Sequence, residues 1–339
     1  MYTDKIKPVQ REHDRSAMGA VEVHAKHISG MEHRAQHGPF SFSSDEPPSL
    51  GGRQAHPLPL AYFTASIGLC AMTQILRFAD QMRIRVDDVT GTVTSRWDRS
   101  GSVLAGTVES RCVGFSMDLD VRSPAPGDHV AALVQNAHAG CFAEQALLGS
   151  TTINSTATFN GTPIEAIASR TSQHAAATDS VRHFPIRVDL RHVGGVSHEA
   201  RWNDFTFFSD EPPHLGGEDK HPIPIAYFAG SVGFCVLTQL VRFAHQLDIP
   251  VKGLRSRTIS HFSRQGSVKA GTVLASLDEF DVHVDVTSPA DAADIAFLLA
   301  LTHRGCYAQN ALLAPVTIDS TLRHNGEALA YQEFPRRVS

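Results

Sequence analysis

The chain has 339 residues, which is long enough for two domains of ordinary size that each bury a core. Its formal net charge is −5 and only 19% of its residues are charged, so we expect no nucleic-acid partner, because such proteins carry a basic surface. The sequence shows neither the apolar stretch of a secretion signal nor a run of about 18 apolar residues, so we expect a cytoplasmic protein without a membrane partner.

The elements of a first unit can be predicted in chain order. Residues 1–17 are polar without periodicity and are expected to form a tail, and residues 18–166 form the unit itself. Alternation predicts a strand near residues 21–25. A further strand is expected to lead into residues 45–52, where Asp-Glu-Pro-Pro and Gly-Gly predict a shaped loop rather than a helix. An apolar stretch then predicts a helix over 58–79 that is buried on most faces.

The second half of this unit is predicted to be mixed in structure. Residues 103–108 and 115–121 have the composition of strands. A second helix is predicted over 128–140 and ends at Cys141, and a last strand is predicted over 151–159. The expected unit is therefore α+β, with two helices of which one is central.

An internal repeat is the most informative feature of the chain. Residues 40–141 recur at 205–306 with a constant offset of 165 and without insertion or deletion. The polar stretch 167–181 is therefore expected to be a linker, and residues 182–339 a second copy of the same unit.

Four of the five cysteines obey this repeat and form two candidate pairs. They are Cys70 with Cys141, and Cys235 with Cys306. In a reducing compartment, paired cysteines are more often catalytic or redox-active thiols than structural bridges. The fifth, Cys112, has a leucine as its counterpart and is expected to be structural.

Two histidines accompany the second cysteine of each pair. His138 and His303 precede it by three residues, which places them on the same helix face. Each is a candidate base, or a cation that lowers a thiol pKa, and a histidine with a purely structural role is the equal alternative. A His-x-x-Cys pair offers two metal ligands, but no third and fourth ligand repeats, so we predict no metal.

These motifs resemble those of the OsmC/Ohr family, the osmotically induced and organic-hydroperoxide-resistance proteins. The resemblance lies in the Asp-Glu-Pro-Pro-x-Leu-Gly-Gly loop, in an apolar helix with a proline-rich start and a central cysteine, and in a Gly-Cys after a second helix. Phe142 and Tyr307 stand where the family usually has a proline. The resemblance implies antiparallel sheets that wrap two central helices, and the two copies would dock as an intrachain pseudo-dimer.

The resemblance also implies a chemistry. In the peroxidase branch, the first cysteine attacks a hydroperoxide and becomes a sulfenic acid, the second condenses with it to a disulfide, and a dithiol reductant restores both. Cys70 and Cys235 would then be the nucleophiles, and Cys141 and Cys306 the resolving thiols, in pockets at the interface between the copies. We predict a cysteine-based peroxidase for organic hydroperoxides or related electrophiles, with a small apolar or aromatic substrate and no cofactor.

The chain departs from the family pattern at two charged positions. The glutamate that the peroxidase branch carries ten residues before the first cysteine is replaced by Leu60 and Ile225. The catalytic arginine is not matched either, because Arg53 in the loop has Glu218 as its counterpart. Without these groups, nothing named holds the first cysteines as thiolates, since burial alone raises a thiol pKa.

Polar residues that repeat near the start of the central helix are candidates for binding the substrate. They are Asp45, Glu46, His56, Asp210, Glu211 and His221. The acidic residues could act as a general acid or base, although binding of loop amides is the favoured interpretation. Arg77 and Arg242 follow the first cysteines by seven residues, on the same helix face, and are more distant candidate partners of a thiolate.

Two other functions stay open on sequence alone. One is a cysteine-dependent hydrolase or lyase that acts on a small apolar or aromatic molecule, with His138 or His303 as its base. The other is a non-enzymatic small-molecule binding protein that retains an apolar pocket. Further homo-oligomerisation of the pseudo-dimer is also open.

Overall fold

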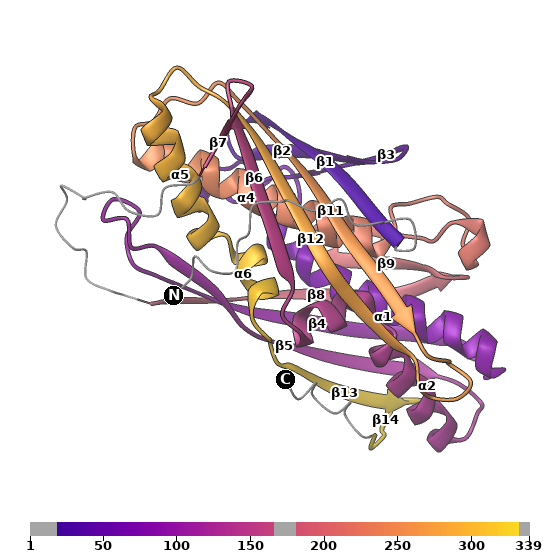
Figure 1. Ribbon diagram of the computed structural model, residues 1–339. Coiled ribbons are helices and arrows are strands. Elements are labelled where there is room, and N and C mark those ends of the chain that lie inside the picture. The colour runs from indigo at the N-terminus through magenta and orange to yellow at the C-terminus, as the bar shows by residue number, and fades with distance from the viewer. Residues whose placement is uncertain (1–18, 166–180, 332–339) are drawn as a thin grey trace.

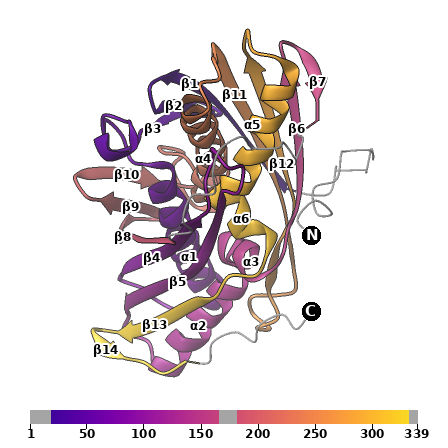
Figure 2. The same cartoon turned by 90° about the vertical axis from the view of Figure 1, so that its left-hand side faces the viewer.

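The computed structural model describes residues 19–165 and 181–331. The predicted tail (1–17) and nearly all of the predicted linker (167–181) lie outside these described residues. Two seven-stranded sheets enclose a layer of helices, as Figures 1 and 2 show. The fold is α+β, as predicted.

The first sheet combines strands from both sequence copies. Its strand order is β3-β2-β1-β11-β12-β6-β7. The first copy supplies β1 (Gly19–Ser29), β2 (Glu32–His37), β3 (Phe40–Ser44), β6 (Thr152–Phe159) and β7 (Thr162–Ile164). The second copy supplies β11 (Gly253–Gln265) and β12 (Leu274–Thr287).

The second sheet has the same arrangement with the copies exchanged. Its order is β10-β9-β8-β4-β5-β13-β14. The second copy supplies β8 (Arg182–Gly194), β9 (Ser197–Trp202), β10 (Phe205–Ser209), β13 (Ile318–His324) and β14 (Glu327–Ala328). The first copy supplies β4 (Asp88–Ser100) and β5 (Glu109–Arg122).

The strands that join the two copies make the sheets mixed rather than wholly antiparallel. β1 pairs with β11, and β4 with β8, in antiparallel register. On the other side of the exchanged strands, β12 pairs with β6, and β5 with β13, in parallel register. Each copy therefore completes the other's sheet, which gives the intrachain pseudo-dimer that the family resemblance implies.

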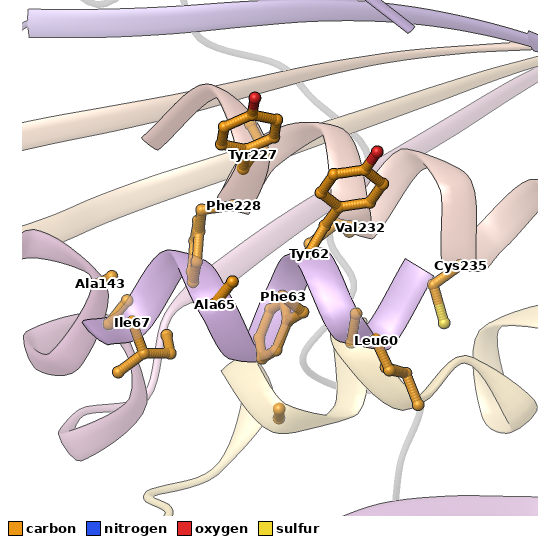
Figure 3. Close-up of a cluster of buried hydrophobic side chains, with 14 of the residues drawn as sticks. Leu60, Tyr62, Phe63, Ala65, Ile67, Ala143, Tyr227, Phe228, Val232 and Cys235 are labelled. Carbon is orange, nitrogen blue, oxygen red and sulfur yellow. The ribbon is translucent and has the colours of Figure 1, made fainter. Parts of the chain in front are cut away.

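The two central helices are α1 (Pro59–Met82) and α4 (Pro224–Gln246). They pack against each other, with α1 also packed on β8 and β4, and α4 on β1 and β11. Each has a proline in its first turn, where a missing N–H costs no helical hydrogen bond. Tyr62 stacks on its repeat equivalent Tyr227, with ring centroids 5.3 Å apart, and Phe63 stacks on Phe228 at 5.2 Å (Figure 3). Equivalent residues thus meet at the pseudo-two-fold axis.

Both central helices are more apolar than the sequence analysis allowed for. By length and composition α1 and α4 could each cross a membrane, contrary to the expectation that no such run exists. In each helix, however, 94% of the apolar window is buried inside the protein. Their apolar surface is therefore accounted for by packing between the two sheets.

Two predictions for the second half of the unit are wrong. Residues 103–108 form no strand but a turn between β4 and β5, because Gly101 and Gly106 adopt φ values of 70° and 69° that reverse the chain. β4 itself was not predicted. In the described residues each copy also has three α-helices rather than two, because a short helix follows the second cysteine, and the loop before each central helix contains a 3-10 helix, η3 (Pro48–Leu50) or η4 (Pro213–Leu215). The smaller helices are α2 (Gly127–Ala139), α3 (Phe142–Leu148), α5 (Ala292–Gly305) and α6 (Tyr307–Leu313).

Candidate functional site

The structure brings the cysteines together in the pairs that the repeat predicts. Cys70 lies in the middle of α1, and Cys141 is the residue that joins α2 to α3. Both are buried and reduced. Burial raises the pKa of Cys141 well above its usual range, and a hydrogen bond and the charge of Cys70 raise it further. The two thiols therefore lie close enough for each to affect the ionisation of the other, although their residues are 71 positions apart in the sequence.

The second pair has the same arrangement, and its two thiols differ in acidity. Burial, the largest single effect, raises the pKa of Cys235. Hydrogen bonds from Cys306 and from the backbone N–H groups of Ala308 and Tyr307 outweigh it, so the net pKa lies below the ordinary value. The pKa of Cys306 is raised well above its usual range, first by burial and then by Cys235. Cys235 is therefore the thiol of this pair that ionises first.

Charged residues from the opposite copy complete the site around Cys235. Glu46, in the loop after β3 of the first copy, interacts with this cysteine through its charge. Its carboxylate lies 3.4 Å from Nη2 of Arg242, and both side chains are about nine-tenths buried. Arg242 follows the cysteine by seven residues in α4, which is about two helical turns. Arg99, at the end of β4, interacts with Arg242 and Tyr307 and lies 5.3 Å above the ring of Phe243.

The site around Cys70 is built from the equivalent residues with the copies exchanged. Glu211 interacts with Arg77 of α1, and Arg264 of β11 interacts with both Arg77 and Cys70. Nη1 of Arg264 donates a hydrogen bond to Oε1 of Gln74 over 3.4 Å. The guanidinium of Arg264 also lies 5.6 Å from the ring centroid of Phe78. Each cysteine pair is thus buried at the interface of the two copies beside a carboxylate and two guanidinium groups.

Burial also changes the acidity of the two glutamates. It raises the pKa of Glu211 to about 7, with Arg77 opposing the change and Asp210 adding to it. Burial likewise raises the pKa of Glu46, against the opposing effect of Arg242. A carboxyl group with a pKa near 7 can both donate and accept a proton at neutral pH, which suits a general acid or base.

The neighbouring aspartates shape the loops that hold these glutamates. The carboxylate of Asp45 accepts hydrogen bonds from the backbone N–H groups of Glu46, Arg53 and Ala55, at 2.8, 3.0 and 3.1 Å. Asp210 binds three backbone N–H groups of its own loop in the same way. The aspartates therefore act on the loop backbone. Of the glutamates that follow them, Glu46 interacts with Cys235 and Glu211 with Arg77.

The Gly-Gly motif of this loop has a steric cause that can be tested. A Cβ atom on Gly52 would lie 1.8 Å from the carbonyl oxygen of Glu46, and one on Gly217 would lie 1.8 Å from that of Glu211. Because the clash is with backbone, the loop must move to relieve it. We expect Gly52→Ala to displace Glu46 and to lower the free energy of unfolding by about 2–4 kcal/mol, as overpacking does. Chemical unfolding checks the stability, and Gly19→Ala, whose Cβ would lie 3.7 Å from the carbonyl oxygen of Phe262, provides a milder comparison.

The two histidines before the second cysteines have structural surroundings. Nδ1 of His138 lies 2.8 Å from the Glu144 carboxylate, and its Nε2 lies 3.4 Å from the hydroxyl of Tyr331. Nδ1 of His303 lies 3.2 Å from Oε1 of Gln309, and burial lowers its pKa. Both rings are thus held by partners six residues further along the chain.

The histidines at the start of the central helices are less buried. Nε2 of His56 lies 3.8 Å from the carboxylate of Glu32, and 38% of the His56 side chain is exposed. His221 stacks on Phe208 with ring centroids 5.1 Å apart. These two residues therefore help to fix the loop that precedes each central helix.

Arg99 and Arg264 are the site residues that sequence reasoning missed. They obey the 165-residue offset, which is a signal that was available. Each belongs to a strand that crosses into the other copy's sheet, so its distance to the cysteines could not be judged from sequence. Arg77 and Arg242 lie closer to the site than was predicted, through the interactions described above.

Comparisons with known proteins place these features in a family. The family model described as OsmC-like protein matches residues 51–156 and 217–321, which together are more than half of the chain. An OsmC-like protein from Mycoplasma pneumoniae is 22% identical in a match that covers 38% of this chain and 90% of that chain, with a TM-score of 0.29. An OsmC-like hydroperoxide resistance protein from Jannaschia sp. CCS1 is 20% identical, covering 37% and 83%, with a TM-score of 0.26. No curated protein matches.

Proposed function

This chain belongs to the OsmC-like family, and on that premise we propose that its two cysteine pairs reduce organic hydroperoxides. The observation that carries the proposal is the pairing of two interacting thiols of unequal acidity in one buried site. The pKa of Cys235 lies below its usual range, while that of Cys306 lies well above it. A thiol that ionises more easily than its partner, beside a resolving thiol that keeps its proton, is what this chemistry needs.

The reaction can be written for the Cys235 pair. The thiolate attacks one peroxide oxygen, so that an S–O bond forms, the O–O bond breaks, and the alkoxide leaves and takes up a proton as the alcohol. Cys306 then attacks the sulfenic acid, an S–S bond forms, and water leaves. The hydroperoxide gains two electrons and the thiols lose them, and an external dithiol returns them by thiol–disulfide exchange.

The surrounding charges bear on the first step. The charge of Glu46 raises the pKa of Cys235, and Arg242 lies 3.4 Å from this carboxylate, so its guanidinium offsets the effect and would stabilise the departing alkoxide. Glu46, or Glu211 in the other site, is placed to supply the proton. The family's usual glutamate position holds Leu60, which lies in the same buried cluster as Cys235 (Figure 3). A carboxylate from the opposite copy thus takes the role of the one that the helix lacks.

Access to the thiols requires local movement, because each of the four paired cysteines is at most 2% exposed. Two hollows, of about 350 and 310 Å³, lie over strands of the two sheets and not over these cysteines. A small apolar hydroperoxide would enter by displacing side chains at the interface, where Arg99 and Arg264 lie over aromatic rings.

Mass spectrometry of the intact protein tests the proposal. After brief exposure to cumene hydroperoxide, we expect a loss of about 2 Da for each reacted pair, with disulfides that link Cys70 to Cys141 and Cys235 to Cys306. A dithiol should restore the starting mass. A hydrolase would instead turn over without a dithiol and without this mass change, and a binding protein would leave the peroxide intact. Retention of all free thiols while peroxide is in excess would rule out the proposed chemistry.

A further inference from the structure

Strands of the first sheet carry a cluster of metal-ligating side chains that the cysteine chemistry does not use. His261 lies on β11, and Glu279 and Asp281 lie on β12, the two strands that the second copy contributes to this sheet (Figure 1). Their nearest nitrogen and oxygen atoms all lie within 4.8 Å of one another. Glu279 and Asp281 alternate with buried Phe280 and Val282, so they point away from the helices.

The cluster is fixed in the sheet by its register and by a residue of the first copy. His261 faces Glu279 across the strand pair, beside a bulge that redirects the His261 side chain. Nε2 of His261 lies 3.0 Å from Oδ2 of Asp281. Asn154 of β6 donates hydrogen bonds from its amide to Asp281, over 2.8 Å, and to Glu279. His261 is 4% exposed and Asn154 is 6% exposed, so packing fixes both side chains in place.

The donor atoms suit a divalent transition-metal ion. One imidazole nitrogen and two carboxylates are ligands that such ions accept, at bond lengths of roughly 2.0–2.2 Å. Ligand atoms around such an ion lie roughly 3–4 Å apart, so the cluster needs only small adjustments. A hollow of about 310 Å³, lined in part by Asn154, Asp281 and His283, gives room for an ion and its water ligands.

The repeat allows a comparison with the equivalent place in the second sheet. There, the counterparts of His261 and Asn154 are Arg96 and Asp319, whose charged groups lie 3.8 Å apart. The counterparts of Glu279 and Asp281 are Gly114 and a serine. A Cβ on Gly114 would lie 3.2 Å from Nη2 of Arg96, so the guanidinium fills this place. In the second sheet, the guanidinium of Arg96 thus occupies the place that corresponds to the imidazole and two carboxylates of the first sheet.

We propose that His261, Glu279 and Asp281 bind a divalent first-row transition-metal ion, with Asn154 holding both carboxylates in position. The expectation of no metal rested on His-x-x-Cys spacing, which does not describe this cluster. Because Asn154 belongs to the first copy and the three ligands to the second, the ion strengthens the junction between β6 and β12. It is a structural site, separate from peroxide reduction.

Manganese binding tests this site, because Mn²⁺ prefers carboxylate and imidazole ligands and binds thiols poorly. Full-length reduced protein is freed of metal with a chelator, and free Mn²⁺ is measured by its electron paramagnetic resonance signal during a titration. We expect one Mn²⁺ per chain and a higher Tm at saturation. Asp281→Asn should weaken the affinity at least about tenfold. His261→Gln should weaken the affinity to the same extent. It serves as the test if Asp281→Asn fails to fold.

His192→Gln is the matched control. His192 lies on β8 in the other sheet, and its Nδ1 lies 3.9 Å from Oδ1 of Asp88, so this variant also removes an imidazole that pairs with a carboxylate. Its replacement should leave the affinity for Mn²⁺ within about twofold. The proposal is overturned by an absence of binding at millimolar Mn²⁺, by unchanged binding in both ligand variants, or by an equal loss in His192→Gln.

Discussion

Replacement of both Cys70 and Cys235 by serine is expected to reduce hydroperoxide reduction to the uncatalysed rate. A hydroxyl at these positions cannot form the thiolate that attacks the peroxide, and the remaining cysteines have pKa values raised well above the usual range, first by burial. The two single variants show how the activity divides between the sites. The measurement is the loss of cumene hydroperoxide with a dithiol in excess, under conditions where circular dichroism shows an unchanged fold.

Cys112→Ser is the control for these variants. Burial raises the pKa of Cys112 to about 12, and this cysteine has no counterpart in the second copy, so it should remain an unreactive thiol. We expect this variant to retain full activity. Because a serine hydroxyl in a buried site can cost about 1–3 kcal/mol when it lacks a partner, Cys→Ala versions separate loss of chemistry from loss of stability. Substantial activity in the Cys70/Cys235 double variant would contradict the proposed nucleophiles.

Removal of a resolving thiol should have a different signature. In Cys306→Ser, the sulfenic acid on Cys235 has no partner thiol in its site, so it should persist and react with dimedone. The unmodified protein should give little such adduct, because Cys306 is in hydrogen-bonding contact with Cys235 and closes the disulfide quickly. Equal labelling of both proteins would show that Cys306 does not resolve the intermediate.

Much of this architecture can be predicted from local sequence patterns. The repeat predicts two equivalent units, the apolar stretches predict the central helices, and the equal spacing of Cys70 and Cys141 with Cys235 and Cys306 predicts the pairs. These features are readable because each depends on neighbouring residues or on a constant offset. β4 is harder to predict, because its apolar residues are few and alternate with small polar ones, whereas the turn that follows it is more apolar.

The composition of the two sites could not be predicted in the same way. Glu46 lies beside Arg242, which is 196 residues away, because β11 and β12 of the second copy join the sheet of β1, β2 and β3, on which α4 packs. Nothing in the strand sequences distinguishes pairing within a copy from pairing between copies, since the two copies carry nearly the same pattern. The sequence therefore identifies Glu46 as a candidate residue of the loop. It does not predict that Glu46 lies next to Cys235 of the opposite copy.

Glu211 should make the protein less stable as the pH rises. Its ordinary pKa of 4.5 is raised to about 7 in the folded state, chiefly by burial. Between these values the folded protein holds a proton that the unfolded chain has released, so stability falls with increasing pH. The contribution is complete below about pH 4.5 and is lost as the pH passes through about 7. At about 1.36 kcal/mol for each pKa unit, the change is on the order of 3 kcal/mol.

Comparison with Glu211→Gln isolates this contribution, because glutamine stays neutral at every pH. Urea unfolding at pH 5, 7 and 9 gives the free energy of unfolding of both proteins. The value for the variant minus that for the unmodified protein should increase by about 3 kcal/mol between pH 5 and pH 9. Glu218→Gln, in the same loop, is the matched control. The Glu218 side chain is 66% exposed and pairs with Lys220, so its replacement should change stability by less than about 0.5 kcal/mol at any pH. A pH-independent difference for Glu211→Gln would mean that this carboxyl ionises normally, and its role as proton donor to the Cys70 site would fall with it.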